Sequence, residues 1–409
     1  MRTVDGMRSA VLAAVALVSF ASCSSDAATS TTVATTTTVA ATTTTTPATT
    51  IAPATTTAVA SSLDAATLAG WLATDAATDP TSPGELVTVL APGTDVSAAG
   101  GSYELGGAPL DADASFRIAS VTKTFTAAAV LRLVEQGSLS LDDTLVSAGT
   151  PDGLLGLLRA DGYAVDTITV AQVLNHSSGL FDYAFGDGSP YVSVVTADPS
   201  HVWTRDEQVA FAMDHGDPVG APGQAMAYSD TGYVVLGAII EARTGRSLGE
   251  AYTSLLHFDA LGMDHTYLQT AGSSPRSTLV GQRFGDIAVA AIDPSVDLFG
   301  GGGLVSTTHD LAVFFRALWG GGVFDDAATW ATLTAITGPD PATAQGIFRA
   351  PIGAVECWFH NGFWGVEVFT CPSIDVTFAR SWNQAGPASS WDHDAVLREV
   401  FTALGHGPR

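Results

Sequence analysis

Basic residues are scarce in this sequence. Its 409 residues contain 16 lysines and arginines against 41 aspartates and glutamates, so the formal net charge is −25. This charge argues against nucleic acid as a partner and against purely electrostatic binding to an anionic membrane. Hydrophobic residues still make up 46% of the chain, enough to fill a substantial core. We therefore interpret the acidity as a device for solubility outside the cell.

Cysteine is scarce as well, and the first of only three lies in a predicted targeting segment. Arg2 and Arg8 precede an apolar run, residues 10–20, that is too short to span a bilayer. The run ends in FASC, which resembles a bacterial lipobox and predicts lipidation of Cys23 after cleavage of a signal peptide, residues 1–23. Because Phe20 is an uncommon first residue for that box, ordinary signal cleavage is the alternative.

A tract of threonine, alanine and proline follows, over residues 24–61. Such a tract has too little bulk to form a core, so it predicts a disordered tether, with O-glycosylation as a further expectation. We expect an exported protein, held at the cell membrane by a lipid on Cys23 or otherwise secreted. In that setting Cys357 and Cys371 predict a disulfide, and a nucleophilic role is disfavoured because neither has a recognisable Cys-His setting.

Strand-like segments lie near both ends of the folded part. Residues 84–92 and 95–107 are typical of a hairpin, and residues 353–383 of two or three antiparallel strands. Helical patterns cover residues 62–76, 116–137, 389–405 and much of 141–298. We therefore predict one α+β domain over residues 62–405. Its antiparallel sheet is flanked by helices and built from both ends of the chain, with a helical domain inserted at about residues 141–298.

The predicted helix over residues 116–137 begins with a serine and a lysine on one face, Ser120 and Lys123. A lysine in the first turn opposes the helix macrodipole. Desolvation and this dipole should lower the pKa of Lys123, and a neutral amine can activate the hydroxyl of Ser120. The alternative, from these two residues alone, is a capping serine beside a solvated lysine.

Two further segments give the pair a family context. Ser120-Val121-Thr122-Lys123 matches S-x-x-K, Tyr228-Ser229-Asp230 resembles Y-x-N, and His360-Asn361-Gly362 resembles K-T-G or H-x-G. In this order, over residues 63–404, the chain resembles the serine β-lactamases, penicillin-binding proteins, D-Ala-D-Ala carboxypeptidases and related esterases, with class C β-lactamases as the nearest pattern. The resemblance predicts a β-lactamase/transpeptidase-like fold.

The resemblance also implies roles for individual residues. Ser120 is the expected nucleophile, and Tyr228 is expected to share acid–base work with Lys123. His360 is expected to bind a substrate carboxylate or to support proton transfer, and Gly362 to allow a close backbone approach. The amides of Ser120 and Phe363 are expected to form an oxyanion hole.

Two positions depart from the family pattern. Asp230 replaces a common asparagine, and it could simply cap a helix that starts at Thr231. If it faces Lys123 as an anion, it should raise the lysine pKa. Asn361 replaces the usual threonine or serine, so its predicted hydrogen bond to substrate is open. A tyrosine and three tryptophans are candidates for the cleft, with core packing as the alternative: Tyr183, Trp203, Trp364 and Trp382.

Other patterns resemble functional motifs but lack the sequence context that those motifs require. Residues 245–249 spell G-x-S-x-G, but a helix precedes them and Ser247 with Glu250 predicts a capping box. No lysine follows the glycines of residues 300–303 as a phosphate loop requires. The histidines form no metal-binding pattern, so we predict neither metal nor cofactor.

Together these features predict an exported serine hydrolase that forms an acyl-Ser120 intermediate. Its expected partner is a small-molecule or peptide substrate, such as a peptidoglycan stem peptide, a β-lactam or a small ester. A histidine in the third element favours the carboxypeptidase and esterase branch. One alternative is a sensor that is acylated without turnover, motivated by Asp230 and Asn361. The other is a surface tether with a structural role only.

Overall fold

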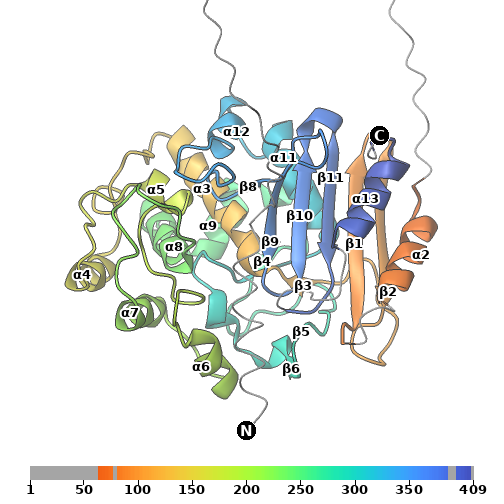
Figure 1. Ribbon diagram of the computed structural model, residues 1–409, viewed down its shortest axis with the longest axis horizontal. Coiled ribbons are helices and arrows are strands. Elements are labelled where there is room, and N and C mark those ends of the chain that lie inside the picture. Colours follow the sequence, from red (N-terminus) through yellow and green to blue (C-terminus); the bar gives the residue numbers. More distant parts are fainter. Residues whose placement is uncertain (1–62, 77–80, 386–392, 407–409) are drawn as a thin grey trace, which may run out of the picture.

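Both ends of the described chain contribute to one sheet (Figure 1). The computed structural model describes residues 63–76, 81–385 and 393–406. The predicted signal peptide with Cys23 and the predicted tether lie outside these residues. The six-stranded sheet has the order β2-β1-β11-β10-β9-β8, and its strands pair antiparallel. The strands are β1 (Gly84–Ala91), β2 (Thr94–Gly101), β8 (Phe348–Arg349), β9 (Trp358–Gly362), β10 (Val366–Cys371) and β11 (Val376–Ser381).

Strand β1 joins the two ends of the sequence, because it pairs with β2 on one side and with β11 on the other. It is buried along its whole length, which matches its run of apolar residues. Alternate side chains enter different layers: Val87 and Val89 pack with helices α2 (Ala65–Ala76) and α13 (His393–Ala403). Leu86 and Leu90 pack with the larger core on the opposite face. The sheet is therefore covered on both faces.

Helix α11 (Thr308–Gly320) covers the face opposite α2 and α13. Thr307 is its N-cap, as predicted, and accepts a hydrogen bond from the amide of Asp310 at 3.1 Å. Beyond α11 lies the buried helix α3 (Thr122–Glu135), which packs against α8 and α9. The remaining helices are α4 (Asp152–Ala160), α5 (Val170–Leu174), α6 (Tyr191–Ala197), α7 (Arg205–His215), α8 (Asp230–Thr244), α9 (Leu248–Leu255), α10 (Phe258–Leu261) and α12 (Ala328–Leu333). Helices α4 to α10 fall within the predicted insertion at residues 141–298, whose boundaries stay a prediction.

Short elements connect the sheet with the helices. A three-stranded sheet has the order β3-β7-β4, and a two-stranded one pairs β5 with β6. These strands are β3 (Phe116–Arg117), β4 (Tyr267–Leu268), β5 (Arg283–Phe284), β6 (Ile287–Ala288) and β7 (Leu304–Ser306), and the short 3-10 helices are η1 (Ala119–Val121), η2 (Val289–Ala291), η3 (Pro294–Asp297) and η4 (Pro372–Ile374). The predicted α+β class with an antiparallel sheet and flanking helices is confirmed.

One predicted helix boundary is wrong. The helix expected from residue 116 begins at Thr122, because Phe116 and Arg117 pair with Ser306 and Val305 of β7. Between strand and helix, Ala119 has a φ of +45°, which an L-residue adopts only at a cost. Tertiary pairing and this bend therefore override the helical pattern, and they place residue 120 at a sharp turn before α3.

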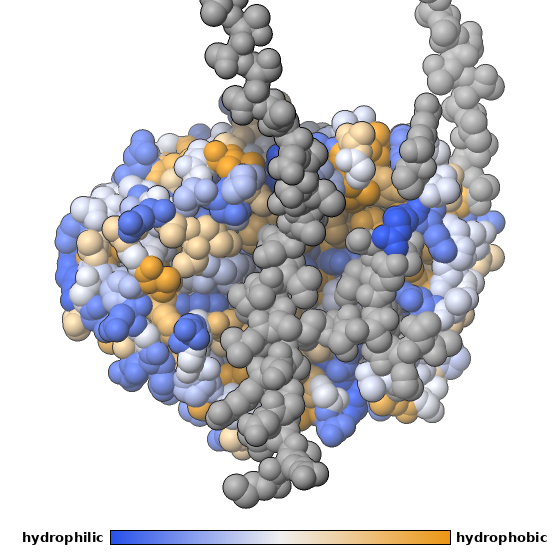
Figure 2. Space-filling view, in the orientation of Figure 1, coloured by the Kyte–Doolittle hydropathy of each residue, from blue (hydrophilic) through white to orange (hydrophobic). Residues whose placement is uncertain are grey.

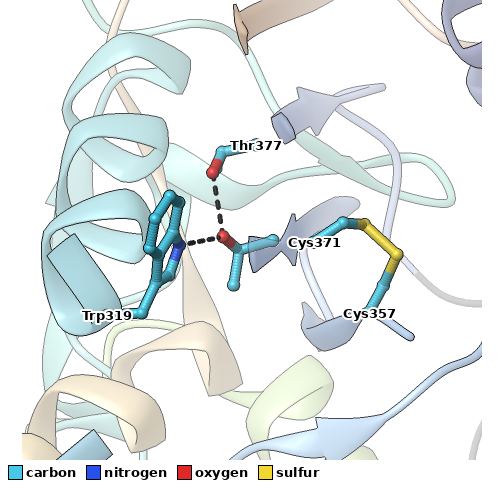
Figure 3. Close-up of a disulfide and its surroundings, with 5 residues drawn as sticks. Trp319, Cys357, Cys371 and Thr377 are labelled. Carbon is cyan, nitrogen blue, oxygen red and sulfur yellow. Dashed lines mark hydrogen bonds between the residues drawn. A yellow bond between two sulfur atoms is a disulfide. The ribbon is translucent and has the colours of Figure 1, made fainter. Parts of the chain in front are cut away.

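The structure contains the predicted Cys357–Cys371 disulfide, shown in Figure 3. It connects the residue before β9 to the end of β10, so it closes the hairpin that carries His360. Next to it, the Thr370 hydroxyl accepts a hydrogen bond from the Trp319 indole at 2.8 Å and lies 2.9 Å from that of Thr377. Among the described residues, no helix has the length and apolarity that crossing a membrane requires. Figure 2 shows hydrophobic residues as separate patches among hydrophilic ones on the visible face.

Candidate active site

The three sequence elements meet where η1, the start of α3, the start of α8 and strand β9 come together. Lys123 is central: its Nζ donates hydrogen bonds to the Ser120 hydroxyl at 3.1 Å and to the Gly301 carbonyl at 2.7 Å. Its third contact is an ion pair with the Asp230 carboxylate. An ammonium group has three donors, so these three acceptors satisfy it completely. The side chain is fully buried, and the geometry fits a charged lysine.

The charge of Lys123 corrects a prediction. Burial disfavours the charged amine, but the Asp230 carboxylate and Tyr228 outweigh burial and raise the pKa of Lys123 above its usual range. The lowered pKa and neutral amine expected from desolvation and the helix dipole are therefore wrong for the resting state. Asp230 does face Lys123 and raises its pKa, as predicted for that arrangement.

Asp230 does not cap the helix. It is the first residue of α8, and the N-cap is Ser229, whose hydroxyl accepts a hydrogen bond from the Gly232 amide at 3.1 Å. The predicted capping role of Asp230 for a helix starting at Thr231 is thus wrong. The side chain of Asp230 is instead free to form the buried pair with Lys123.

A second carboxyl group, which the sequence analysis missed, lies beside Asp230. Asp182 Oδ1 accepts hydrogen bonds from the amides of Ala184 at 2.9 Å and Asp230 at 3.3 Å. Burial and the nearby Asp230 raise the pKa of Asp182 to about 8. The protonated form of Asp182 is therefore favoured near neutral pH. The segment FDY around it carries no motif that could have identified it.

Tyr228 completes the polar centre. Lys123 Nζ lies 5.0 Å from the centroid of its ring, and the ring stacks on His176 with centroids 4.4 Å apart. Burial raises the pKa of Tyr228 to about 12, although the charge of Lys123 opposes this. The resting phenol is therefore protonated, and it can pass a proton between Ser120 and Lys123.

Two buried histidines flank this centre. His360 Nδ1 lies 2.7 Å from the Asn361 carbonyl, which can only accept, so Nδ1 carries the proton and Nε2 a lone pair. His176 Nδ1 accepts from the Ser229 amide at 3.1 Å, so its proton is on Nε2. Burial and the charge of Lys123 lower the pKa of His360 to about 3. A neutral imidazole offers no charge to a substrate carboxylate, and the predicted part of His360 in proton transfer stays a prediction.

Strand β9 brings its backbone close to Ser120. A Cβ atom on Gly362 would lie 2.2 Å from the Ile118 carbonyl oxygen, so this approach requires glycine. No described residue accepts a hydrogen bond from the amide of Ser120 or of Phe363, which leaves both amides available as a pair of donors. Asn361 is exposed and alternates with buried His360 along the strand. Its predicted role in substrate binding stays a prediction.

An open cavity of about 540 Å³ begins at Ser120. Its walls are apolar, apart from Ser120 and two acids, and include aromatic rings. The lining residues are Ala119, Ser120, Tyr183, Ala184, Phe185, Tyr191, Val192, Val195, Asp230, Phe284, Ile292, Val296, Asp297, Phe363 and Trp364. Tyr183 and Trp364 thus line the cavity, which is one of the two roles predicted for them; the other was packing in the core. Trp203 packs between Tyr191 and Phe211, and Trp382 is buried near Arg380.

The G-x-S-x-G pattern of residues 245–249 lies between two helices and does not form a nucleophile site. Ser247 lies between α8 and α9, and with Glu250 it forms the predicted capping box. Within the part of the chain that the structure describes, no three His, Cys, Asp or Glu side chains come together as metal ligands would. The chemistry of the site therefore has to be read from Ser120 and its neighbours.

Comparison with known proteins gives related chains over most of this fold. The family model described as Beta-lactamase matches residues 69–402. Penicillin-binding protein 4 of Amycolatopsis lactamdurans is 31% identical over 186 residues, 44% of this chain and 43% of that protein. Esterase EstB of Burkholderia gladioli is 36% identical over 152 residues, 37% of this chain and 38% of that protein. The matches thus span less than half the length of these two relatives. A crystal structure of a D-stereospecific amidohydrolase from Streptomyces sp. has a TM-score of 0.69 at 25% identity, covering 83% of this chain and 99% of that one.

Proposed function

The chain belongs to the β-lactamase family of serine hydrolases, and from this premise we propose that it hydrolyses small esters or amides with an apolar acyl group. The acyl group is carried on Ser120 during the reaction. The observation that supports this most strongly is the position of Ser120, within hydrogen-bond distance of Lys123 and at the wall of the apolar cavity. The Amycolatopsis, Burkholderia and Streptomyces relatives are named as a penicillin-binding protein, an esterase and an amidohydrolase. The last two names describe hydrolysis of esters and amides, the reaction proposed here.

The charges around the cavity favour the esterase and amidase branch over the carboxypeptidase branch. A peptide C-terminus or the acid group of a β-lactam presents a carboxylate, which is usually bound by a cation. No lysine, arginine or histidine is among the described residues that line the cavity. Lys123 is fully engaged, and His360 is neutral. An apolar side chain on the acyl group, by contrast, gains from burial against the aromatic walls.

The proposed reaction begins with proton movement. The ion pair allows Lys123 to pass one proton to Asp230, and the neutral amine then takes the proton of the Ser120 hydroxyl, directly or through Tyr228. The Ser120 oxygen attacks the carbonyl carbon, and the negative charge moves to the carbonyl oxygen. The amides of Ser120 and Phe363 stabilise that oxyanion, where one donor is typically worth about 10²–10³-fold in rate. The leaving group departs with a proton from the Lys123–Tyr228 pair, and water releases the acyl group by the same steps.

The test is a substrate panel read by product formation and by intact mass. The panel contains a D-Ala-D-Ala peptide, a chromogenic β-lactam, p-nitrophenyl esters and an aryl amide of a fatty acid. We expect the wild type to hydrolyse esters or amides, and a fluorophosphonate to label it but not the Ser120→Ala variant. Preference for the D-Ala-D-Ala peptide would replace the esterase assignment with a carboxypeptidase one. Absence of label and of turnover on every substrate would overturn the hydrolase proposal.

A second candidate function follows from the fully coordinated ammonium of Lys123. Three acceptors around a charged lysine slow its deprotonation, which favours a sensor that is acylated and does not turn over. Intact mass over time separates the two functions. An adduct that persists indicates a sensor, whereas an adduct that decays while product appears indicates an enzyme.

Export and anchoring are a separate proposal. They are supported by the signal-like run, by the lipobox-like residues before Cys23 and by the disulfide, which is typical of an oxidising compartment. Expression of the full chain in a bacterium with radiolabelled palmitate provides the test. We expect the label in the membrane fraction, and loss of it in a Cys23→Ala variant. Unlabelled protein released to the medium would instead support ordinary signal cleavage.

A further inference from the structure

Asp297 is an acidic residue in the cavity wall to which neither the sequence motifs nor the proposed reaction assigns a role. It ends the short helix η3 and lines the cavity next to Val296. Its Oδ2 accepts a hydrogen bond from the Trp364 indole at 3.1 Å. Its Oδ1 makes no hydrogen bond with any described residue. One carboxylate oxygen is thus held by Trp364, and the other has no hydrogen-bond partner among the described residues.

Asp297 is attracted by the charge of Arg117 but forms no ion pair with it. It takes part in none of the ion pairs found among residues 63–76, 81–385 and 393–406. Arg117 lies near enough to attract it, but its guanidinium donates to Gln269 Oε1 at 2.8 Å and to the Val289 carbonyl at 3.2 Å. Carboxylates in apolar surroundings are ordinarily paired. An unpaired one in a substrate cavity is suited to a cationic group of the ligand.

Asp297 also lines the same cavity as Ser120. Its partner Trp364 directly follows Phe363, whose amide is a proposed oxyanion donor. Asp297 is also within electrostatic reach of both Asp230 and Lys123. Ser120, Phe363, Trp364 and Asp297 line the same cavity, so the α-carbon substituents of a carbonyl held between Ser120 and Phe363 share this cavity with Asp297. The other acid in the wall, Asp230, is already paired with Lys123.

We propose that Asp297 binds a protonated amine on the acyl group, which makes the preferred substrates amides or esters of amino acids with a free α-amine and a large apolar side chain. This inference rests on the proposed hydrolase function of Ser120. The ammonium group pairs with Oδ1 of Asp297, and the apolar side chain occupies the space between Tyr183, Phe185 and Ile292.

The test compares phenylalanine methyl ester with methyl 3-phenylpropionate, which lacks only the amine, and uses both enantiomers of the amino acid. For the wild type we expect a higher kcat/KM on one phenylalanine ester than on the amine-free ester. The Asp297→Asn variant keeps an oxygen acceptor for Trp364 but removes the charge. It should lose about 10–100-fold in kcat/KM on the phenylalanine ester, mostly through KM, and stay within about twofold on the amine-free ester.

Controls separate a binding role from a structural one. The Asp293→Asn variant removes a charge from the N-cap of the same helix outside the cavity wall, and it should leave the ratio of the two kcat/KM values unchanged. An equal loss on both esters in Asp297→Asn would mean that Asp297 only holds Trp364, and would overturn the proposal. An unchanged ratio in Asp297→Asn would overturn it as well.

A binding measurement keeps the inference testable if the wild type hydrolyses neither ester. The Ser120→Ala variant is titrated calorimetrically with phenylalanine amide and with 3-phenylpropionamide. Tighter binding of the amine, lost on adding Asp297→Asn, would support the role of Asp297 even though the esterase proposal had failed. Equal binding of the two amides would overturn the role of Asp297 whatever the activity.

Discussion

Replacing Asp230 with asparagine should lower the pKa of Lys123. The wild-type carboxylate forms a buried ion pair with the lysine and outweighs the burial that would otherwise favour the neutral amine. Asparagine has nearly the same shape and keeps an oxygen acceptor for Nζ, so the variant changes mainly the charge. Burial is then opposed only by Tyr228 and the neutral acceptors.

The size of the effect follows from Coulomb's law. Two unit charges about 4 Å apart attract by about 4 kcal/mol at an effective dielectric constant of about 20. Because one pKa unit corresponds to about 1.4 kcal/mol, the pKa of Lys123 should fall by about three units in Asp230→Asn. At pH 7 the neutral fraction of the amine should rise by about a thousand-fold. The acid limb of the kcat/KM profile should move to lower pH by a similar amount.

The sequence makes the assay direct, because Lys123 is its only lysine. Protein grown with lysine labelled with ¹³C at Cε gives a single side-chain signal, whose chemical shift reports the charge of Nζ as pH changes. Asp310→Asn is a matched control, since Asp310 is a buried carboxylate whose partners are the His265 amide and the Thr266 hydroxyl. It should leave the Lys123 titration unchanged. An Asp230→Asn protein that titrates at the wild-type pH would refute this explanation of the lysine charge.

Three further changes test other parts of the site and fold. Tyr228→Phe removes a phenol beside Ser120 and Lys123, so kcat should fall by about 10²–10⁴-fold while the melting temperature changes little; a kcat within threefold of wild type would rule out proton transfer by Tyr228. Burial raises the pKa of Asp182 to about 8, so the folded state holds this proton more tightly than the unfolded chain, and its contribution to stability is lost as pH rises from about 4 to about 8. Asp182→Asn should therefore become more stable relative to wild type at pH 9 than at pH 5, by about 1–3 kcal/mol in urea unfolding, and a pH-independent difference would contradict a raised pKa. Replacing Cys357 and Cys371 together by alanine opens a loop with a sequence separation of 14 and should lower the free energy of unfolding by about 3 kcal/mol; an equally stable variant would show that the hairpin does not need the bond.

Local patterns were sufficient for much of the fold. The β1–β2 hairpin, the strands β9 to β11 and the helices α2 and α13 all lie where alternation and helical periodicity place them. The start of α3 was misjudged because Phe116 and Arg117 pair with β7, which lies far away in the sequence. Periodicity over one segment carries no information on such a partner.

The candidate site, too, was predictable from local sequence only in part. S-x-x-K, Y-x-N and H-x-G identified residues that the fold brings together around Lys123. The charge of Lys123 was misjudged because it depends on contact with a carboxylate 107 positions later in the sequence. Asp182 and Asp297 belong to no motif, and their unusual surroundings appear only after folding. Motifs therefore indicated where the chemistry lies, and tertiary contacts set the protonation states.

Direct detection of the acyl intermediate is the measurement that tests the central claim. Wild type and Ser120→Ala are mixed with a p-nitrophenyl ester, quenched with acid after milliseconds to minutes, and examined by intact mass and by peptide mapping. We predict an adduct of the acyl mass on the peptide that contains Ser120, which decays as the acid product appears and is absent from Ser120→Ala. Turnover at the wild-type rate in Ser120→Ala, or an adduct on another residue, would contradict the assignment of Ser120 as the nucleophile.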